Sequence, residues 1–195
     1  MTLFVLRRLT VEVSRMHRCL LLAAFLFAAS AALAAGQEQK PAPPPSPCTV
    51  TEQHQLDFWL GDWDLTWPGS EPNTVQHGTN HVIRILDSCV VEENFSGGND
   101  MHLRGKSVSL FDTRSGKWKQ TWVDNEGAYL DFVGDFKNNM MTLSRAFTTP
   151  DGKPMQQRMI FKNLAGDEFD WSWESSTDQG KTWQVVWPIH YRRHK

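Results

Sequence analysis

After residue 60 the sequence repeats one pattern: short stretches of alternating apolar and polar residues, separated by turns rich in Gly, Asn and Asp. Alternation with a period of two is typical of a β-strand with one buried face, and these turn residues tolerate the positive φ angles of tight hairpins. Because nearly every connection is short, consecutive strands are expected to pair antiparallel as a meander. The pattern predicts ten strands, at Asp64–Trp67, Thr79–Leu86, Cys89–Phe95, Leu103–Asp112, Trp118–Val123, Ala128–Phe136, Met140–Phe147, Met155–Asn163, Glu168–Ser175 and Trp183–Arg192.

A meander of ten strands without covering helices predicts a closed barrel, since an open sheet would leave two edges free to aggregate. A two-sheet sandwich is the alternative, but sandwiches usually need longer crossovers than these turns supply. The one helical signal lies in Glu52–Trp63, where apolar residues recur at helical spacing and Gly61 limits the length. We therefore expect an all-β, antiparallel up-and-down barrel that begins with a short helical turn.

Alternation assigns one face of each strand to the barrel interior. Most of the nine tryptophans are expected on that face, and Trp183 and Val185 should share it with Trp187 on the last strand. On the strand Leu103–Asp112 the inward residues are glycine and serine, with a leucine and a phenylalanine at its ends. Small side chains inside a barrel of this size leave space for a ligand.

Several polar residues also fall on the inward face, chiefly Gln120, Arg145 and Tyr191, with Glu92 or Glu93 as a further candidate. A buried charge needs a partner or a ligand. Arg145 is the sharpest case, because a guanidinium binds a carboxylate or another anion through two parallel hydrogen bonds. The alternative for Arg145 is an internal pair with a glutamate, which would make it a structural residue.

Residues 1–35 have the features of a targeting segment. Met16–Arg18 is a short basic region, Cys19–Ala34 is apolar and uncharged, and residues 32–34 form a small-x-small cleavage pattern. The segment predicts a secretory signal peptide, with residues 1–15 as an upstream extension and Met1 or Met16 as the start. A membrane anchor is the alternative, but a spanning helix needs about 20 apolar residues. We expect a periplasmic or secreted protein with no membrane span after cleavage.

Residues 36–47 contain QEQKPAPPPSP, a proline-rich stretch that favours an extended linker and cannot pack a core. The folded part is expected over residues 48–195, which is the size of a single domain. Without residues 1–35 the chain has 16 basic and 21 acidic residues, a net charge of −5. Nucleic-acid binding needs clustered positive charge, so no nucleic-acid partner is expected.

Two cysteines, Cys48 and Cys89, remain after the targeting segment. In an oxidising compartment an isolated pair is usually bridged, so we predict a disulfide that fastens the start of the domain to the second or third strand. Its loop of about 40 residues is worth about 4 kcal/mol in the chain-entropy model. A reactive thiol and a metal pair are the alternatives, but the Cys and His spacing matches no metal motif.

The sequence holds no nucleophile motif, no glycine-rich phosphate loop and no histidine pair at metal-ligand spacing. A lone inward histidine such as His81 could bind haem iron, which is a less favoured alternative to an ordinary hydrogen-bonded role. Acid–base catalysis would need an inward carboxylate, with Glu92 and Asp124 as candidate bases, whereas alternation places Glu174 outside. The pattern of Ser176–Trp183 predicts a stapled hairpin turn rather than a sugar or metal site.

Longer motifs run through the folded part. FWLGDWDL at 58–65 resembles the FWLGxWxL opening of a family of bacterial secreted proteins of unknown function. SCVVE at 88–92, with Ser88 in place of the usual glycine, WKQTWVDNEG at 118–127 and the final Tyr191-Arg192 resemble later motifs of that family. The opening is also similar to that of lipocalin-like and nitrobindin-like barrels. The resemblance implies a calycin-type barrel that binds a small ligand; nitrobindin-like barrels hold haem through a C-terminal histidine, a role we do not transfer to His190 or His194.

Together these features predict an exported lipocalin-like protein that binds a small apolar or amphipathic ligand, with an anionic group as an option. An isomerase or hydrolase that uses the same cavity is one rival hypothesis, and a structural envelope module with a filled barrel is another. The expected apolar walls are Trp122, Trp173 and Trp187, and the expected polar anchors are Gln120, Arg145 and Tyr191.

Overall fold

The computed structural model describes residues 48–99 and 101–195, so the predicted signal peptide and the predicted linker lie outside the described residues. All ten predicted strands are present in the described part of the chain, with small differences at their ends. Their bounds are Gly61–Pro68 (β1), Val75–Ile85 (β2), Val90–Ser96 (β3), Arg104–Asp112 (β4), Lys117–Asp124 (β5), Tyr129–Lys137 (β6), Met140–Thr148 (β7), Pro154–Lys162 (β8), Glu168–Ser176 (β9) and Gln184–Arg193 (β10).

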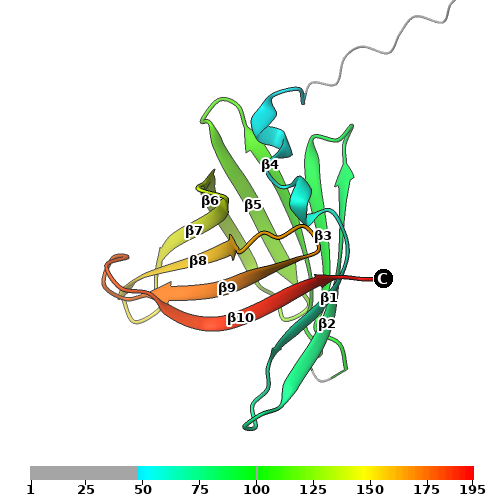
Figure 1. Cartoon of the computed structure of the whole chain (residues 1–195). Helices are drawn as coiled ribbons and strands as arrows, with labels where there is room; N and C mark the ends of the chain where they lie inside the picture. Colours follow the sequence, from blue (N-terminus) through cyan, green and yellow to red (C-terminus); the bar gives the residue numbers. More distant parts are fainter. Residues whose placement is uncertain (1–47, 100) are drawn as a thin grey trace, which may run out of the picture. The chain divides into compact units, whose positions relative to one another are not determined.

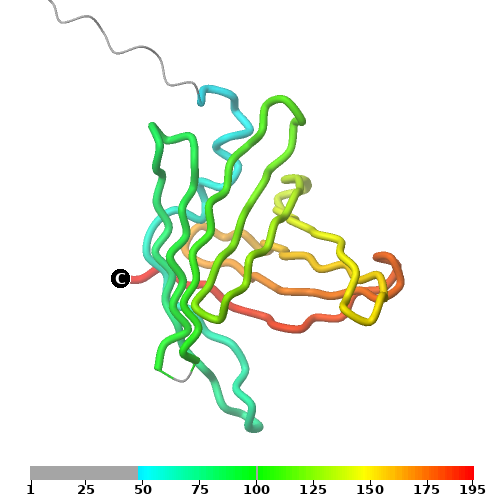
Figure 2. The backbone as a smooth tube through the Cα atoms, turned by 180° about the vertical axis from the view of Figure 1, so that it is seen from behind, coloured from blue at the N-terminus to red at the C-terminus, as the bar shows by residue number. Residues whose placement is uncertain are grey.

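Each strand pairs antiparallel with its neighbours along the chain, and β1 also pairs with β10, which closes the sheet into a barrel. This confirms the predicted all-β up-and-down barrel rather than the sandwich. Figures 1 and 2 show the axes of the antiparallel strands β2–β5 roughly upright and those of β8–β10 crossing them steeply, as expected for a strongly twisted sheet.

Two short 3₁₀ turns, η1 (Thr51–His54) and η2 (Asp57–Trp59), precede β1 and lie at one end of the barrel beside β4 (Figure 1). Gln55 accepts a hydrogen bond of 2.9 Å from Trp118 Nε1, and the buried Trp59 ring packs edge-on against Phe161 at 5.0 Å between centroids. The predicted helical turn is thus confirmed in a short form. It closes this end of the barrel with apolar side chains.

The inner face of β4 is the predicted one. Ser107 and Ser109 are buried, while Val108 and Leu110 lie on the outer face, each about 40% exposed. The room left by the small residues is partly taken up, because a Cβ on Gly105 would lie only 2.0 Å from the Trp122 indole. The glycine therefore allows Trp122 to lie flat against β4.

The last strand departs from the prediction. A β-bulge between Val185 and Trp187 shifts the pairing with β9, so Trp187 faces inward while Val185 lies opposite Glu174 on the outer face. Val185 is 51% exposed, and Trp183 stacks against the Arg158 guanidinium at 3.9 Å. One extra residue reverses the side-chain direction on one side of a bulge. The prediction that Trp183 and Val185 share the inner face is therefore wrong.

The predicted staple at Ser176–Trp183 is confirmed. Asp178 accepts hydrogen bonds from the Thr182 amide (2.9 Å) and hydroxyl (2.6 Å), and Ser176 Oγ accepts one from the Gly180 amide (2.9 Å). Trp183 Nε1 donates to the Gly180 carbonyl at 3.1 Å. All of these hydrogen bonds lie within the β9–β10 hairpin, as expected for a turn that is complete without a ligand.

A disulfide joins Cys48 to Cys89, with Cα atoms 5.1 Å apart. Cys89 is the last residue of the β2–β3 turn, in which Ser88 has a φ of 70°. This left-handed backbone favours glycine, the residue that the resembled family usually has at this position. The bridge spans 41 positions and encloses β1 and β2, so it ties the entering chain to the barrel.

Removal of this disulfide in C48S/C89S is expected to lower the free energy of unfolding by about 4 kcal/mol, because the unfolded chain regains the entropy of an open loop. Urea unfolding followed by tryptophan fluorescence measures the difference between the oxidised wild type and the double variant. Equal midpoints and slopes for the two proteins would contradict this role.

Candidate ligand site in the barrel interior

The barrel interior holds a cavity of about 260 Å³. The three tryptophans predicted as apolar walls, Trp122, Trp173 and Trp187, all line it, together with further aromatic and aliphatic side chains. Ligand sites commonly measure roughly 300–1,000 Å³, so this cavity lies just below that range and suits only a small molecule.

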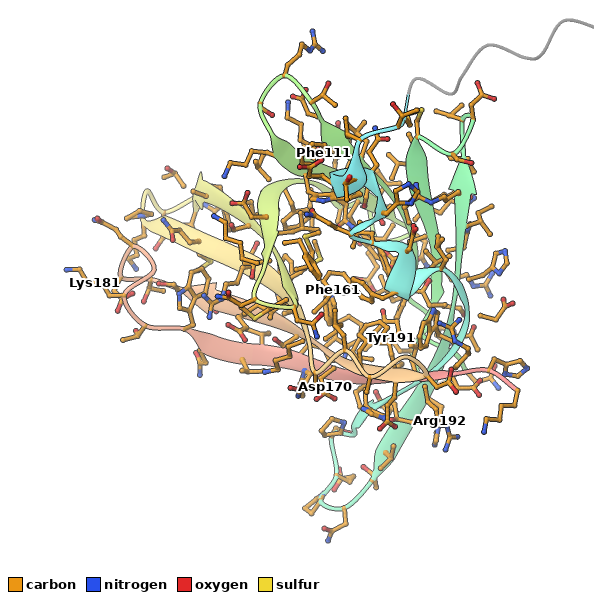
Figure 3. The ribbon with its side chains drawn as sticks, turned by 45° about the horizontal axis from the view of Figure 1, so that its top comes forward. Phe111, Phe161, Asp170, Lys181, Tyr191 and Arg192 are labelled. Atoms are coloured by element: carbon orange, nitrogen blue, oxygen red, sulfur yellow. A yellow bond between two sulfur atoms is a disulfide. The ribbon has the colours of Figure 1, made fainter. Side chains whose placement is uncertain are left out.

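The cavity runs from partly exposed to fully buried side chains. Leu103, Trp122 and Leu130 are partly exposed, whereas Phe161 and Tyr191 are only 1% and 2% exposed. Figure 3 shows Phe161 and Tyr191 on the inside of the ring of strands. The mouth therefore lies toward Leu103 and Trp122, and the inner end lies under the η1–η2 segment.

The walls are held by edge-to-face ring contacts. Trp187 meets Trp67, Phe95 and Trp171 with centroid distances of 5.5, 5.8 and 5.8 Å. Phe132 meets Trp173 in the same way at 5.6 Å. Such contacts fix ring orientation beyond simple burial, so the cavity is shaped before any ligand enters.

One carboxyl group lies in the mostly apolar lining of the cavity. Glu93, on β3, faces the cavity, where Asn80 Nδ2 donates to its Oε1 at 2.7 Å and Ser107 Oγ donates to its Oε2 at 2.6 Å. Asn80 Nδ2 also donates to the Tyr191 hydroxyl at 3.2 Å. We call Asn80, Glu93, Ser107 and Tyr191 the deep polar cluster.

Burial dominates the protonation of this cluster. Burial raises the pKa of Glu93 to about 7, although the hydrogen bonds from Ser107 and Asn80 favour the carboxylate. Burial also raises the pKa of Tyr191, and the neighbouring Glu93 charge adds to that rise. Near neutral pH the cluster therefore holds a glutamate that can be a hydrogen-bond donor as well as an acceptor.

Two cavity-lining tryptophans, Trp59 and Trp187, have a buried Nε1 without a hydrogen-bond partner among the described residues, and so has Oδ1 of Asn80, which lies behind Glu93 and does not line the cavity. The Trp59 indole N–H approaches the Tyr191 hydroxyl without reaching hydrogen-bonding geometry. Buried polar groups are nearly always paired, so unpaired ones beside a cavity point to an occupant.

The predicted polar anchors have different positions. Tyr191 lines the cavity and belongs to the deep polar cluster. Gln120 is buried outside the lining, where its Nε2 donates to Ser109 Oγ at 2.9 Å. Gln120 is thus paired within the wall, and the structure does not bring it together with the other anchors.

Arg145 lies just past the end of the β6–β7 ladder, whose last pair is Val133–Ser144. Its guanidinium is 4.6 Å from the Phe147 ring centroid and 6.0 Å from that of Phe132, which lines the cavity. In the described part of the chain it forms no salt bridge, so the alternative of an internal Arg145–Glu pair is wrong.

The arginine–glutamate pair that does form is Arg158–Glu174, at 2.6 Å on the outer face. Glu174 points outward as predicted, yet it is only 5% exposed because Arg158 covers it and Ser172 Oγ donates to it at 2.9 Å. This pair stabilises the outer face of β8 and β9 and does not reach the cavity.

Neither predicted catalytic base faces the cavity. Glu92 lies on the outer face, and the hydrogen bond from Asn94 lowers its pKa, with a smaller effect from Lys106. Burial opposes ionisation of Asp124, but hydrogen bonds from the Ala128 amide and Trp122 Nε1 lower its pKa. Asp124 therefore caps the β5–β6 turn and orients Trp122, while Glu93 is the carboxyl group inside.

The six histidines of the described ranges are all exposed. His81 Nδ1 forms a hydrogen bond with Asp62 on the outer face, so the predicted inward position of His81 is wrong. His190 and His194 pair in the same way with Asp170 and Asp64. Across the described residues there is no group of three or more His, Cys, Asp or Glu side chains that could hold a metal ion.

No family model matches the sequence, and no curated protein is significantly similar to it. The solved structures that are similar include the crystal structure of Rv2717c from M. tuberculosis, with 14% sequence identity and a TM-score of 0.48 over 75% of this chain and 99% of that chain. A likeness of this size adds no functional information, so membership of the resembled family stays a prediction. Within the described ranges, no helix has the length and apolar character to span a membrane.

Glu93 is expected to make stability depend on pH. Its pKa is about 7 in the folded protein against an ordinary value of 4.5, so the folded state holds the proton more tightly between these values. The free energy of unfolding should fall as the pH rises from about 4.5 through 7, by about 3 kcal/mol in all. Urea unfolding of the wild type and Glu93→Gln at several pH values measures this, and parallel pH profiles would contradict it.

Proposed function

We propose that this protein is an exported carrier that binds a small amphipathic acid inside its barrel. The observation that supports this best is an indole-walled cavity with Arg145 at its rim, an arginine that forms no salt bridge with any described residue. A cavity of this size also speaks against a barrel filled only by its own side chains. The apolar body of the ligand would lie among the tryptophans, and its anionic group would pair with Arg145.

The strand register supports this orientation. Arg145 lies opposite Gln157, and Gln157 lies opposite Ser175, which together form a polar row on the inner face. One inward step deeper on the same strands lie Met159 and Trp173, both of which line the cavity. A carboxylate held by the polar row would therefore direct its apolar chain into the cavity.

The chemistry of Arg145 favours an anion over a neutral head group. The guanidinium has five N–H donors, and here its faces are covered by rings rather than by acceptors. A carboxylate can take two of these donors in parallel, and partial exclusion of water strengthens the pair. A neutral hydroxyl would leave the charge uncompensated.

The expected cellular location supports a carrier role. The predicted signal peptide would send the protein out of the cytoplasm, and the Cys48–Cys89 disulfide suits an oxidising compartment. We infer that the ligand is met in the periplasm or outside the cell. A closed barrel protects such an apolar molecule from water.

Decanoate is expected to bind and to change the intrinsic tryptophan fluorescence, because five tryptophans line the cavity. Arg145→Ala should weaken decanoate binding at least about tenfold, the value of one charge-assisted hydrogen bond, and should leave decanol binding unchanged. Fluorescence titration with both compounds measures this.

The matched control is Arg104→Ala, since Arg104 is an exposed arginine at the start of β4. It should bind both compounds like the wild type. Equal loss of decanoate binding in the two variants would indicate a general charge effect, and unchanged binding in Arg145→Ala would exclude Arg145 as the anion site.

A further inference from the structure

We propose that the deep polar cluster and the Trp59 indole form a second subsite, which binds an uncharged oxygen group of the ligand, a carbonyl or a hydroxyl. This inference rests on the proposed function and names the ligand class more closely. The ligand would be a medium-chain oxo-acid or hydroxy-acid, with its carboxylate at Arg145 and its second oxygen at the inner end.

The first support is the position of Glu93. It is a carboxyl group only 6% exposed, set among rings and aliphatic side chains, and it faces the cavity rather than a cation. Burying such a group costs stability unless its hydrogen bonds are complete, and an apolar side chain of similar size would usually be more stable there. A carboxyl group at this position is therefore expected to interact with a ligand in the cavity.

The second support is the set of unfilled hydrogen-bonding positions. Trp59 is 1% exposed, and its Nε1 approaches the Tyr191 hydroxyl without meeting hydrogen-bond geometry with it or with another acceptor in the described part of the protein. Asn80 uses both donors of its amide on Glu93 and Tyr191, which leaves its Oδ1 without a donor. A carbonyl or hydroxyl oxygen of a ligand in the cavity would accept a hydrogen bond from the Trp59 indole N–H.

The surrounding charges select an uncharged group. Glu93 is approached by Asn80 from β2, by Ser107 from β4 and by Tyr191 from β10, and none of these is a cation. A second carboxylate would meet the Glu93 charge in an apolar setting, which is unfavourable. A carbonyl or hydroxyl needs only donors, which Trp59 and a protonated Glu93 supply.

The separation of the two subsites allows one medium-length chain to reach both. On β9 the rim residue Ser175 and the inner residue Phe169, which faces Tyr191, are six positions apart. At a rise of about 3.3 Å per residue this is roughly 20 Å along the backbone, and side chains reach inward from both ends. An acid with a chain of intermediate length would therefore place one oxygen group at each subsite.

The test compares decanoate with 9-oxodecanoate, which adds one carbonyl near the far end of the same chain. Isothermal titration should show that the wild type binds 9-oxodecanoate about tenfold more tightly than decanoate, the value of one good buried hydrogen bond. Glu93→Met should lose this preference, whereas Glu93→Gln should keep most of it because its amide can still donate.

Glu92→Gln is the matched control, since Glu92 is the adjacent carboxylate on the outer face, and it should behave like the wild type. Glu92→Gln should also leave decanoate affinity unchanged, and urea unfolding of all three variants shows whether the barrel is intact. Decanoate binding without any preference for 9-oxodecanoate, or a preference that survives in Glu93→Met, would overturn the second subsite and leave the carrier function standing. Failure of the wild type to bind either acid would overturn both.

Discussion

The interior of this barrel depends on a short ladder that joins the first strand to the last. Four residue pairs, from Trp63–Arg193 to Thr66–His190, close the sheet. Arg193 strengthens the closure, because its guanidinium donates to the Leu60 carbonyl at 2.9 Å and lies 4.2 Å from the Trp63 ring. Without this ladder the two edges would be open to water and to other chains.

The closure also positions the inner end of the candidate site. Two residues before Arg193, Tyr191 stacks on Phe169 at 4.3 Å and meets the edge of Trp63 at 6.0 Å. These contacts place its hydroxyl beside Asn80, and through Asn80 beside Glu93. The return of β10 to β1 therefore brings Tyr191 to the deep polar cluster, whose other three residues come from the consecutive strands β2, β3 and β4.

Alternation along the chain was sufficient to predict the ten strands, the closed meander and the inward direction of Trp122, Trp173 and Trp187. It failed at the β10 bulge, because an inserted residue changes the side-chain direction without a clear sequence signal. Alternation also did not decide which of Glu92 and Glu93 faces inward. In the structure Glu93 shares the inner face with Val91 and Phe95, which are both buried. The pairing of Gln120 with Ser109, and the lack of a carboxylate partner for Arg145 among residues 48–99 and 101–195, depend on distances across strands that no local pattern contains.

The central claim is that the indole-walled cavity is where a ligand binds. Leu130 lines this cavity, and Val133, on the same strand, lies on the outer face with 47% exposure. Leu130→Trp fills the cavity, whereas Val133→Trp adds the same ring to the outside, so decanoate titration of the two variants separates the interior from the surface. We predict that Leu130→Trp remains folded and no longer binds decanoate while Val133→Trp binds it like the wild type, and equal binding by both variants would contradict the claim.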